Sequence, residues 1–262
     1  MNNDRKKTGP TPATPPEAPF QDGPNPTLHP PRVHTMRMGH LPLTIFATIA
    51  ISALFALAFD LGSAPAVAGT SLLVLLILFA GITPRMSGTP VTAGTRFTVA
   101  RVALTCLLGG LAVIPAASPP EPLLWSIALM GLAAAGLWAV DGWLARITYS
   151  ASGFSERLGA LAGALLAVAL ALLVWRLGLC GIWVMAAGAF AFADAAVQAG
   201  RRIQRSDAWQ VGADFLIRAA LAVAIIPATP PLAVTGLTVL ATASAIGLMG
   251  HTLRHGADLD AV

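Results

Sequence analysis

Eight long apolar stretches, separated by shorter polar or proline-containing segments, make up most of the hydrophobic pattern of this chain. Each is close to the roughly 20 residues that a helix needs to cross a bilayer, and each carries few charges. Because lipid offers the backbone no hydrogen-bonding partner, we predict that these stretches are helices. The predicted segments are 41–59, 66–82, 97–115, 122–140, 158–175, 177–197, 211–228 and 232–249.

The composition strengthens this interpretation. Hydrophobic residues make up 56% of the 262 positions, charged residues make up 11%, and the mean hydropathy is +0.73, which is too apolar for an ordinary soluble domain. We therefore expect an all-α polytopic integral membrane protein with about eight transmembrane helices. Residues 1–40 contain nine prolines and little apolar periodicity. We expect them to form a disordered cytoplasmic tail and not a signal peptide.

The positions of the cations predict the orientation in the membrane. Short loops rich in Lys and Arg stay on the cytoplasmic side. If the tail is cytoplasmic and eight helices alternate in direction, fourteen of the sixteen cations lie on that side, and Arg176 and Arg218 are the exceptions. We therefore expect both termini on the cytoplasmic side of a cytoplasmic or inner membrane. No nucleic-acid motif accompanies the basic charge, so no nucleic-acid partner is expected.

A polar motif follows the fourth apolar stretch. Asp141-Gly142 and Ala145-Arg146 are followed by Ser155 and then by the fifth stretch. This resembles the CDP-alcohol phosphatidyltransferase family, whose pattern D-x2-D-G-x2-A-R-x8-G-x3-D-x3-D spans two adjacent helices. The segments RFTVARVAL (96–104) and LLVWRLGLCGIWV (172–184) are also similar to that family. The resemblance implies membrane enzymes of phospholipid biosynthesis that transfer a phosphatidyl-type group from a CDP-linked lipid to an alcohol.

The resemblance also implies a domain layout. A six-helix core of the CDP-alcohol phosphatidyltransferase type would cover residues 95–250. Two additional transmembrane helices would occupy residues 41–94, and residues 251–262 would form a cytoplasmic tail.

The chain departs from the family pattern at the carboxylates. Trp138 stands where the first Asp belongs, Ser155 replaces the Gly, and Gly159 and Gly163 replace the third and fourth Asp. Only Asp141 remains as a metal ligand, and Mg²⁺ usually needs one or two carboxylates together with substrate phosphates. We therefore assign no catalytic residue and expect no cofactor, with Mg²⁺ or Mn²⁺ required if the protein is active. The glycines form a GxxxG pattern, which predicts a close approach of helix backbones and permits a homodimer.

Several positions of the motif survive. By resemblance, they surround the cytidine nucleotide and diphosphate of a CDP-linked lipid, and arginines there would bind phosphate oxygens. The alternative is structural: arginines at helix ends anchor the topology, and Asp141 is then a helix-end partner of Arg146. The residual substrate-binding and nucleotide-binding residues are Thr98, Arg101, Asp141, Gly142, Ala145 and Arg146.

Two further carboxylates lie inside predicted helices, where charge is costly. Asp214 lies four residues before Arg218, which predicts an i,i+4 ion pair. Asp194 lies near the cytoplasmic end of the sixth segment. We interpret Cys106 and Cys180 as small core residues. His251 and His255 have a spacing that can bind a metal, but no third ligand is nearby, so we place them in the solvated tail.

Three functional classes remain open at this point. The first is a catalytically degenerate relative, a pseudoenzyme that acts by lipid or nucleotide binding or by association with a partner. The second is an active transferase with unusual metal ligation. The third is a transporter-like protein. Membrane lipid is the expected partner in each case.

Overall fold

The computed structural model describes the backbone of residues 40–82, 93–113, 119–148, 153–201 and 208–260, and the side chains of residues 46–76, 100–113, 119–138, 159–198 and 209–254. These residues form eight α-helices and one short 3-10 helix, η1 (Ile182–Val184). The helices are α1 (His40–Ala58), α2 (Ala64–Ile82), α3 (Ala93–Leu111), α4 (Glu121–Thr148), α5 (Gly153–Arg176), α6 (Met185–Arg201), α7 (Ala208–Ala224) and α8 (Pro231–Asp260).

Local sequence signals define several helix ends. At the end of α5, Gly178 has a positive φ of 68°, and the amide of Leu179 donates to the carbonyl of Val174 over 3.1 Å. This is the glycine-terminated helix cap in which a left-handed residue reverses the chain. Helix α8 starts at Pro231. Proline is favoured at the first position of a helix, because an amide hydrogen there would have no acceptor within the helix. These turns return the chain to the bundle with few residues.

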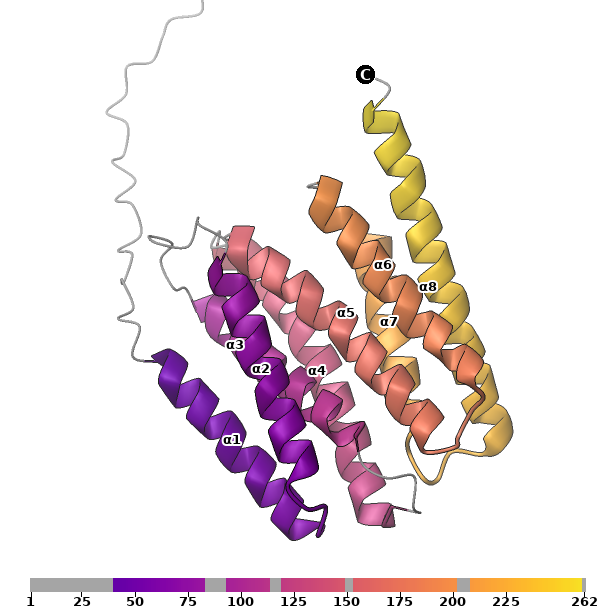
Figure 1. Cartoon of the computed structure of the whole chain (residues 1–262). Coiled ribbons are helices and arrows are strands. Elements are labelled where there is room, and N and C mark those ends of the chain that lie inside the picture. The colour runs from indigo at the N-terminus through magenta and orange to yellow at the C-terminus, as the bar shows by residue number, and fades with distance from the viewer. Residues whose placement is uncertain (1–39, 83–92, 114–118, 149–152, 202–207, 261–262) are drawn as a thin grey trace, which may run out of the picture. The chain divides into compact units, whose positions relative to one another are not determined.

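The helices lie side by side, and most consecutive helices run antiparallel to each other (Figure 1). Six of them pack in a closed cyclic order, α3, α4, α7, α8, α6 and α5, in which each helix contacts the next. Helix α5 also contacts α4 and α7 across this ring, whereas α2 packs along α3, and α1 packs on α2 and α3. The ring therefore has an interior to which several helices, far apart in sequence, contribute side chains.

The interior of the bundle and its outer surface are both largely apolar. Leu166, Leu170 and Leu221 are fully buried in the main core, while Leu54, Leu232 and Ile246 are exposed. Within the described residues, three helices are long and apolar enough to cross a membrane, over Glu121–Trp138, Gly159–Arg176 and Pro231–Arg254. The protein is an all-α integral membrane protein, because exposed apolar side chains of this kind need a lipid environment.

A helix lies in each of the eight predicted segments, and three boundaries differ from the prediction by about eight residues or more. Helix α6 begins at Met185 and not at residue 177, because Gly178 ends α5 in a turn and Gly181 precedes η1. Helices α4 and α8 extend about 8 and 11 residues past the predicted ends, to Thr148 and Asp260. Hydropathy detects the apolar part of a helix and not its polar continuation.

Candidate functional site

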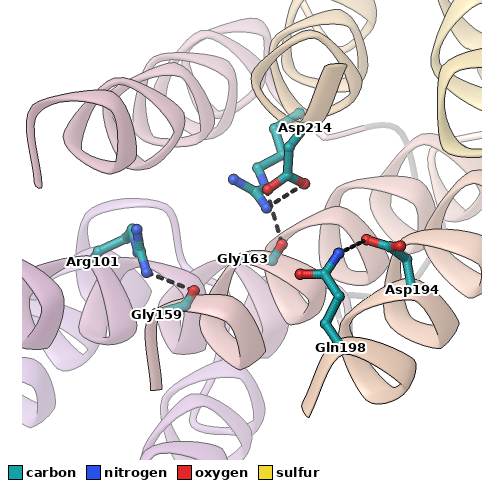
Figure 2. A network of polar contacts seen from close by, with 7 residues as sticks. Arg101, Gly159, Gly163, Asp194, Gln198 and Asp214 are labelled. Carbon is teal, nitrogen blue, oxygen red and sulfur yellow. Dashed lines mark hydrogen bonds and ion pairs between the residues drawn. The ribbon is translucent and has the colours of Figure 1, made fainter. Parts of the chain in front are cut away.

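Charged and amide side chains gather in the interior of the helix ring, together with the residues that contact them. We call this group the interior polar layer. Its polar side chains are Arg101, Asp194, Gln198, Asp214 and Arg218, and the residues in contact with the arginines are Trp138, Gly159 and Gly163. Figure 2 shows the polar contacts of the layer at close range, without Trp138, and Gly159 and Gly163 lie on successive turns of α5. At 1.5 Å of rise per residue, the charged members of the layer lie about 9 to 15 Å from the helix ends formed by 93, 201 and 208. The layer therefore lies about two to three helical turns inside these ends, at the level where the apolar spans of α4 and α5 end and begin, at Trp138 and Gly159.

Arg101 of α3 reaches across to α5. Its side chain is 1% exposed, and its Nη2 atom donates to the carbonyl oxygen of Gly159 over 2.6 Å. A Cβ atom added at Gly159 would lie 2.8 Å from the same Nη2 atom. The absence of a side chain at residue 159 thus creates the space in which the guanidinium lies, close enough to bond the backbone carbonyl of α5.

Arg218 of α7 makes a second contact of the same kind. Its Nε atom donates to the carbonyl of Gly163 over 3.1 Å, and its Nη2 atom lies 2.6 Å from Oδ1 of Asp214. The guanidinium also lies over the ring of Trp138, with Cζ 5.1 Å from the ring centroid. A Cβ atom at Gly163 would overlap this guanidinium. Ion pairing, a backbone acceptor and an aromatic face together compensate the burial of this charge.

Asp194 of α6 forms the third part of the layer. Its side chain is fully buried, and its Oδ2 atom accepts a hydrogen bond of 2.6 Å from Nε2 of Gln198, one turn further along α6. The described charges of the layer are therefore two arginines and two aspartates. Because the formal charges cancel, the layer as a whole avoids a net charge in the low-dielectric interior.

The prediction of a buried Asp214–Arg218 pair is confirmed. The explanation of the GxxxG glycines is corrected: Gly159 and Gly163 lie against arginine side chains and not against a helix backbone. Close backbone approach occurs at other glycines. A Cβ atom at Gly188 would lie 2.9 Å from the backbone of α5, and Gly110 lies directly against the backbone of α2.

The structure describes only one of the predicted substrate-binding side chains, that of Arg101. Helices α3 and α4 include Thr98, Asp141, Gly142, Ala145 and Arg146, but the side chains of these residues lie outside the described set. The prediction of Asp141 as a metal ligand falls outside it for the same reason. Among the described side chains, no group of three or more His, Cys, Asp or Glu residues is arranged to hold a metal ion.

The structure also describes Trp138 and His251. Trp138, which stands where the family pattern has its first Asp, presents its ring to the guanidinium of Arg218. His251 lies within α8 and not in a tail; its ring is 5.3 Å from that of Trp209, and its Nδ1 atom is 3.1 Å from Nε2 of Gln210. The side chain of His255 is not among those described.

The two cysteines also have defined environments. Cys106 is fully buried, as predicted, and Cys180 is half-buried with Sγ 3.5 Å from Oγ1 of Thr238. Sequence reasoning did not identify Gln198 as a member of the polar layer. Its i,i+4 spacing from Asp194 was the available signal.

The chain matches no protein-family model, no curated protein and no solved structure. The function therefore has to be inferred from the motif around Asp141 and from the interior polar layer.

Proposed function

We propose that the protein is a non-catalytic relative of the CDP-alcohol phosphatidyltransferases that binds a CDP-linked lipid or its nucleotide without transferring the lipid group. In this proposal eight helices span the membrane, both termini are cytoplasmic, and the six-helix ring is the core of the family type. Helices α1 and α2 are then an addition that packs on α3.

Two glycines of α5 give the main support for the loss of catalysis. Gly159 and Gly163 stand where the family pattern has its third and fourth carboxylates, and each is in contact with an arginine guanidinium. A carboxylate-bound divalent cation would have to share this space with two protein cations. Because Asp214 is already paired with Arg218 and the glycines supply no carboxylate, the arrangement disfavours a metal between α3, α5 and α7.

The proposal assigns binding to the parts of the motif that remain. Arg146 carries positive charge that a diphosphate requires, whereas Arg101 is buried and held by the Gly159 carbonyl. The motif places Gly142 where a ligand can approach the backbone closely. Without a base and a metal to activate an acceptor hydroxyl, bound ligand would not react. The protein would then act as a sensor or carrier of the CDP-linked lipid, or would present it to a partner.

The test combines two measurements on the detergent-purified full-length chain. CDP-diacylglycerol and CMP should each raise the unfolding temperature, since a ligand at 100 times its Kd stabilises the folded state by about 2.7 kcal/mol. With Mg²⁺ or Mn²⁺ and a panel of alcohols, CMP release should equal that of heat-inactivated protein. The Arg146→Ala variant should lose the thermal shift, and Arg205→Ala, which removes a cation between α6 and α7, should keep it.

Each alternative outcome selects another function. CMP release above background means an active transferase with unusual metal ligation, and it overturns the proposal. No thermal shift at millimolar ligand leaves the motif arginines as topological anchors and also overturns it. A shift that persists in Arg146→Ala places the ligand elsewhere on the protein.

A further inference from the structure

A groove on the outer surface of the ring lies between α7 and α8, away from the interior polar layer. It has a volume of about 300 Å³ and is lined by Trp209, Gly212, Ala213, Leu216 and Ser244. Small side chains on both helices create this hollow, because larger residues at those positions would fill the space between the two backbones.

The groove opens toward lipid. Leu216 and Trp209, which line it, are 39% and 53% exposed. In a protein whose outer surface contacts hydrocarbon, a hollow between apolar side chains is filled by acyl chains, since it offers water few partners. The lining residues include no charged side chain.

One end of the groove is polar and cationic. Trp209, which is 53% exposed, stacks near His251, and the Gln210 amide contacts the same imidazole. Arg254 is exposed and lies one turn beyond His251, at the end of the apolar span of α8. Ser244, His251 and Arg254 follow each other at helical spacing, so they share one side of α8.

The apolar end and the polar end of the groove lie apart along the helix axes. Leu216 and Ser244 each lie seven residues from the aromatic pair Trp209–His251, which is about 10 Å along the helix axes. The end at Leu216 and Ser244 is therefore apolar, the end at Trp209 and His251 is aromatic and polar, and Arg254 lies one turn further along α8. This order matches the order of groups in a phospholipid.

We propose that the groove between α7 and α8 binds one phospholipid of the surrounding bilayer, with an acyl chain between Gly212 and Ser244 and the phosphate at Arg254. Charge complementarity selects the headgroup class, because Arg254 is a strong donor to phosphate oxygens. Anionic phospholipids are bound more tightly than neutral diacylglycerol. This site does not depend on the nucleotide-binding function proposed above.

Two exposed glycines provide a matched test. A Cβ atom added at Gly212 or at Gly236 meets no atom within 4 Å, so both positions accept a larger residue without a steric clash. Gly212→Leu fills the groove, whereas Gly236→Leu changes α8 outside its lining. Ser244→Leu fills the groove from the other helix and replaces Gly212→Leu if that variant does not fold.

The measurement is native mass spectrometry of the full-length protein titrated with dioleoylphosphatidylglycerol. The wild-type and Gly236→Leu proteins should bind one molecule per chain. Gly212→Leu should bind at least about tenfold more weakly, because excluding even about two methylenes from an apolar site has that effect. Arg254→Gln should weaken binding of phosphatidylglycerol and leave the weaker binding of dioleoylglycerol unchanged.

The outcomes separate this proposal from the others. Equal phosphatidylglycerol binding by Gly212→Leu and Gly236→Leu overturns the site. A dimer in light scattering that Gly212→Leu disrupts shows that a second copy, and not a lipid, occupies the groove. The CMP-induced thermal shift should persist in Gly212→Leu, so failure of the nucleotide site and failure of the lipid groove give different results.

Discussion

Replacement of Gly163 by alanine tests the central contact of the interior polar layer. The added Cβ would lie 2.8 Å from Cζ of Arg218 and 3.3 Å from its Nη1 atom, and the three nearest atoms all belong to this arginine. We expect the backbone of α5 to stay in place, because the flexible arginine side chain can move away from the added Cβ atom. The guanidinium then leaves the Gly163 carbonyl and shifts away from Asp214.

The expected cost follows from the contacts that are lost. A hydrogen bond from a charged donor contributes about 1.5 to 3 kcal/mol, and breaking a buried ion pair costs about 3 to 5 kcal/mol. Alanine favours a helix over glycine by about 1 kcal/mol, which offsets part of this loss. Because the guanidinium is displaced and not removed, only part of the ion-pair energy is lost, and we expect Gly163→Ala to lower the free energy of unfolding by about 1 to 4 kcal/mol.

The assay is reversible unfolding of the purified protein in mixed detergent, with Gly136→Ala as the control. A Cβ at Gly136 meets no atom within 4 Å, so this variant should be unchanged or more stable by up to about 1 kcal/mol. The Asp214→Asn, Arg218→Met double variant provides a neutral background in which the penalty of Gly163→Ala should disappear. The reasoning is refuted if Gly163→Ala is as stable as Gly136→Ala, or if the penalty remains in the neutral background.

Three further predictions concern other parts of the chain. Gly188→Ala should destabilise the protein by about 1 to 3 kcal/mol, because the added Cβ would lie 2.9 Å from the backbone of α5; a chemical denaturation midpoint equal to wild type contradicts this. Gln198→Leu removes the donor to the Asp194 carboxylate and should cost about 1.5 to 3 kcal/mol in the same assay, whereas no change would mean that the bond is not formed. A reporter fused after Val262 should be cytoplasmic and one inserted between 116 and 121 external; an external carboxyl terminus would show that the number of spans is odd.

The helices of the fold could be predicted because the hydropathy signal of each helix lies within its own residues. Each helix carries its own apolar stretch, and the pairing of Asp214 with Arg218 depends only on the helical repeat. The polar end of α8 was missed because a helix that leaves the membrane loses its hydropathy signal while keeping its hydrogen bonds. For this reason the hydropathy pattern places His251 in a tail, whereas it lies within α8.

The interior polar layer could not be predicted in full, because its contacts join helices far apart in sequence. Arg101 and Gly159 are separated by 58 residues, and Arg218 and Gly163 by 55. A single sequence shows that glycines occur four apart, but it does not show what lies against them. GxxxG spacing predicts a close approach, and only the order of helices around the ring determines that the approaching group is a guanidinium.

The contact between Arg218 and Gly163 also constrains the order in which substitutions can accumulate. With glycine at 163, the guanidinium of Arg218 fills the space that a Cβ atom would occupy, so a larger residue at 163 has to displace it. A substitution at 163 therefore costs stability while the arginine is present, and the cost falls once residue 218 is shorter. The two positions are coupled: among related sequences, we expect an arginine at 218 to accompany a glycine at 163.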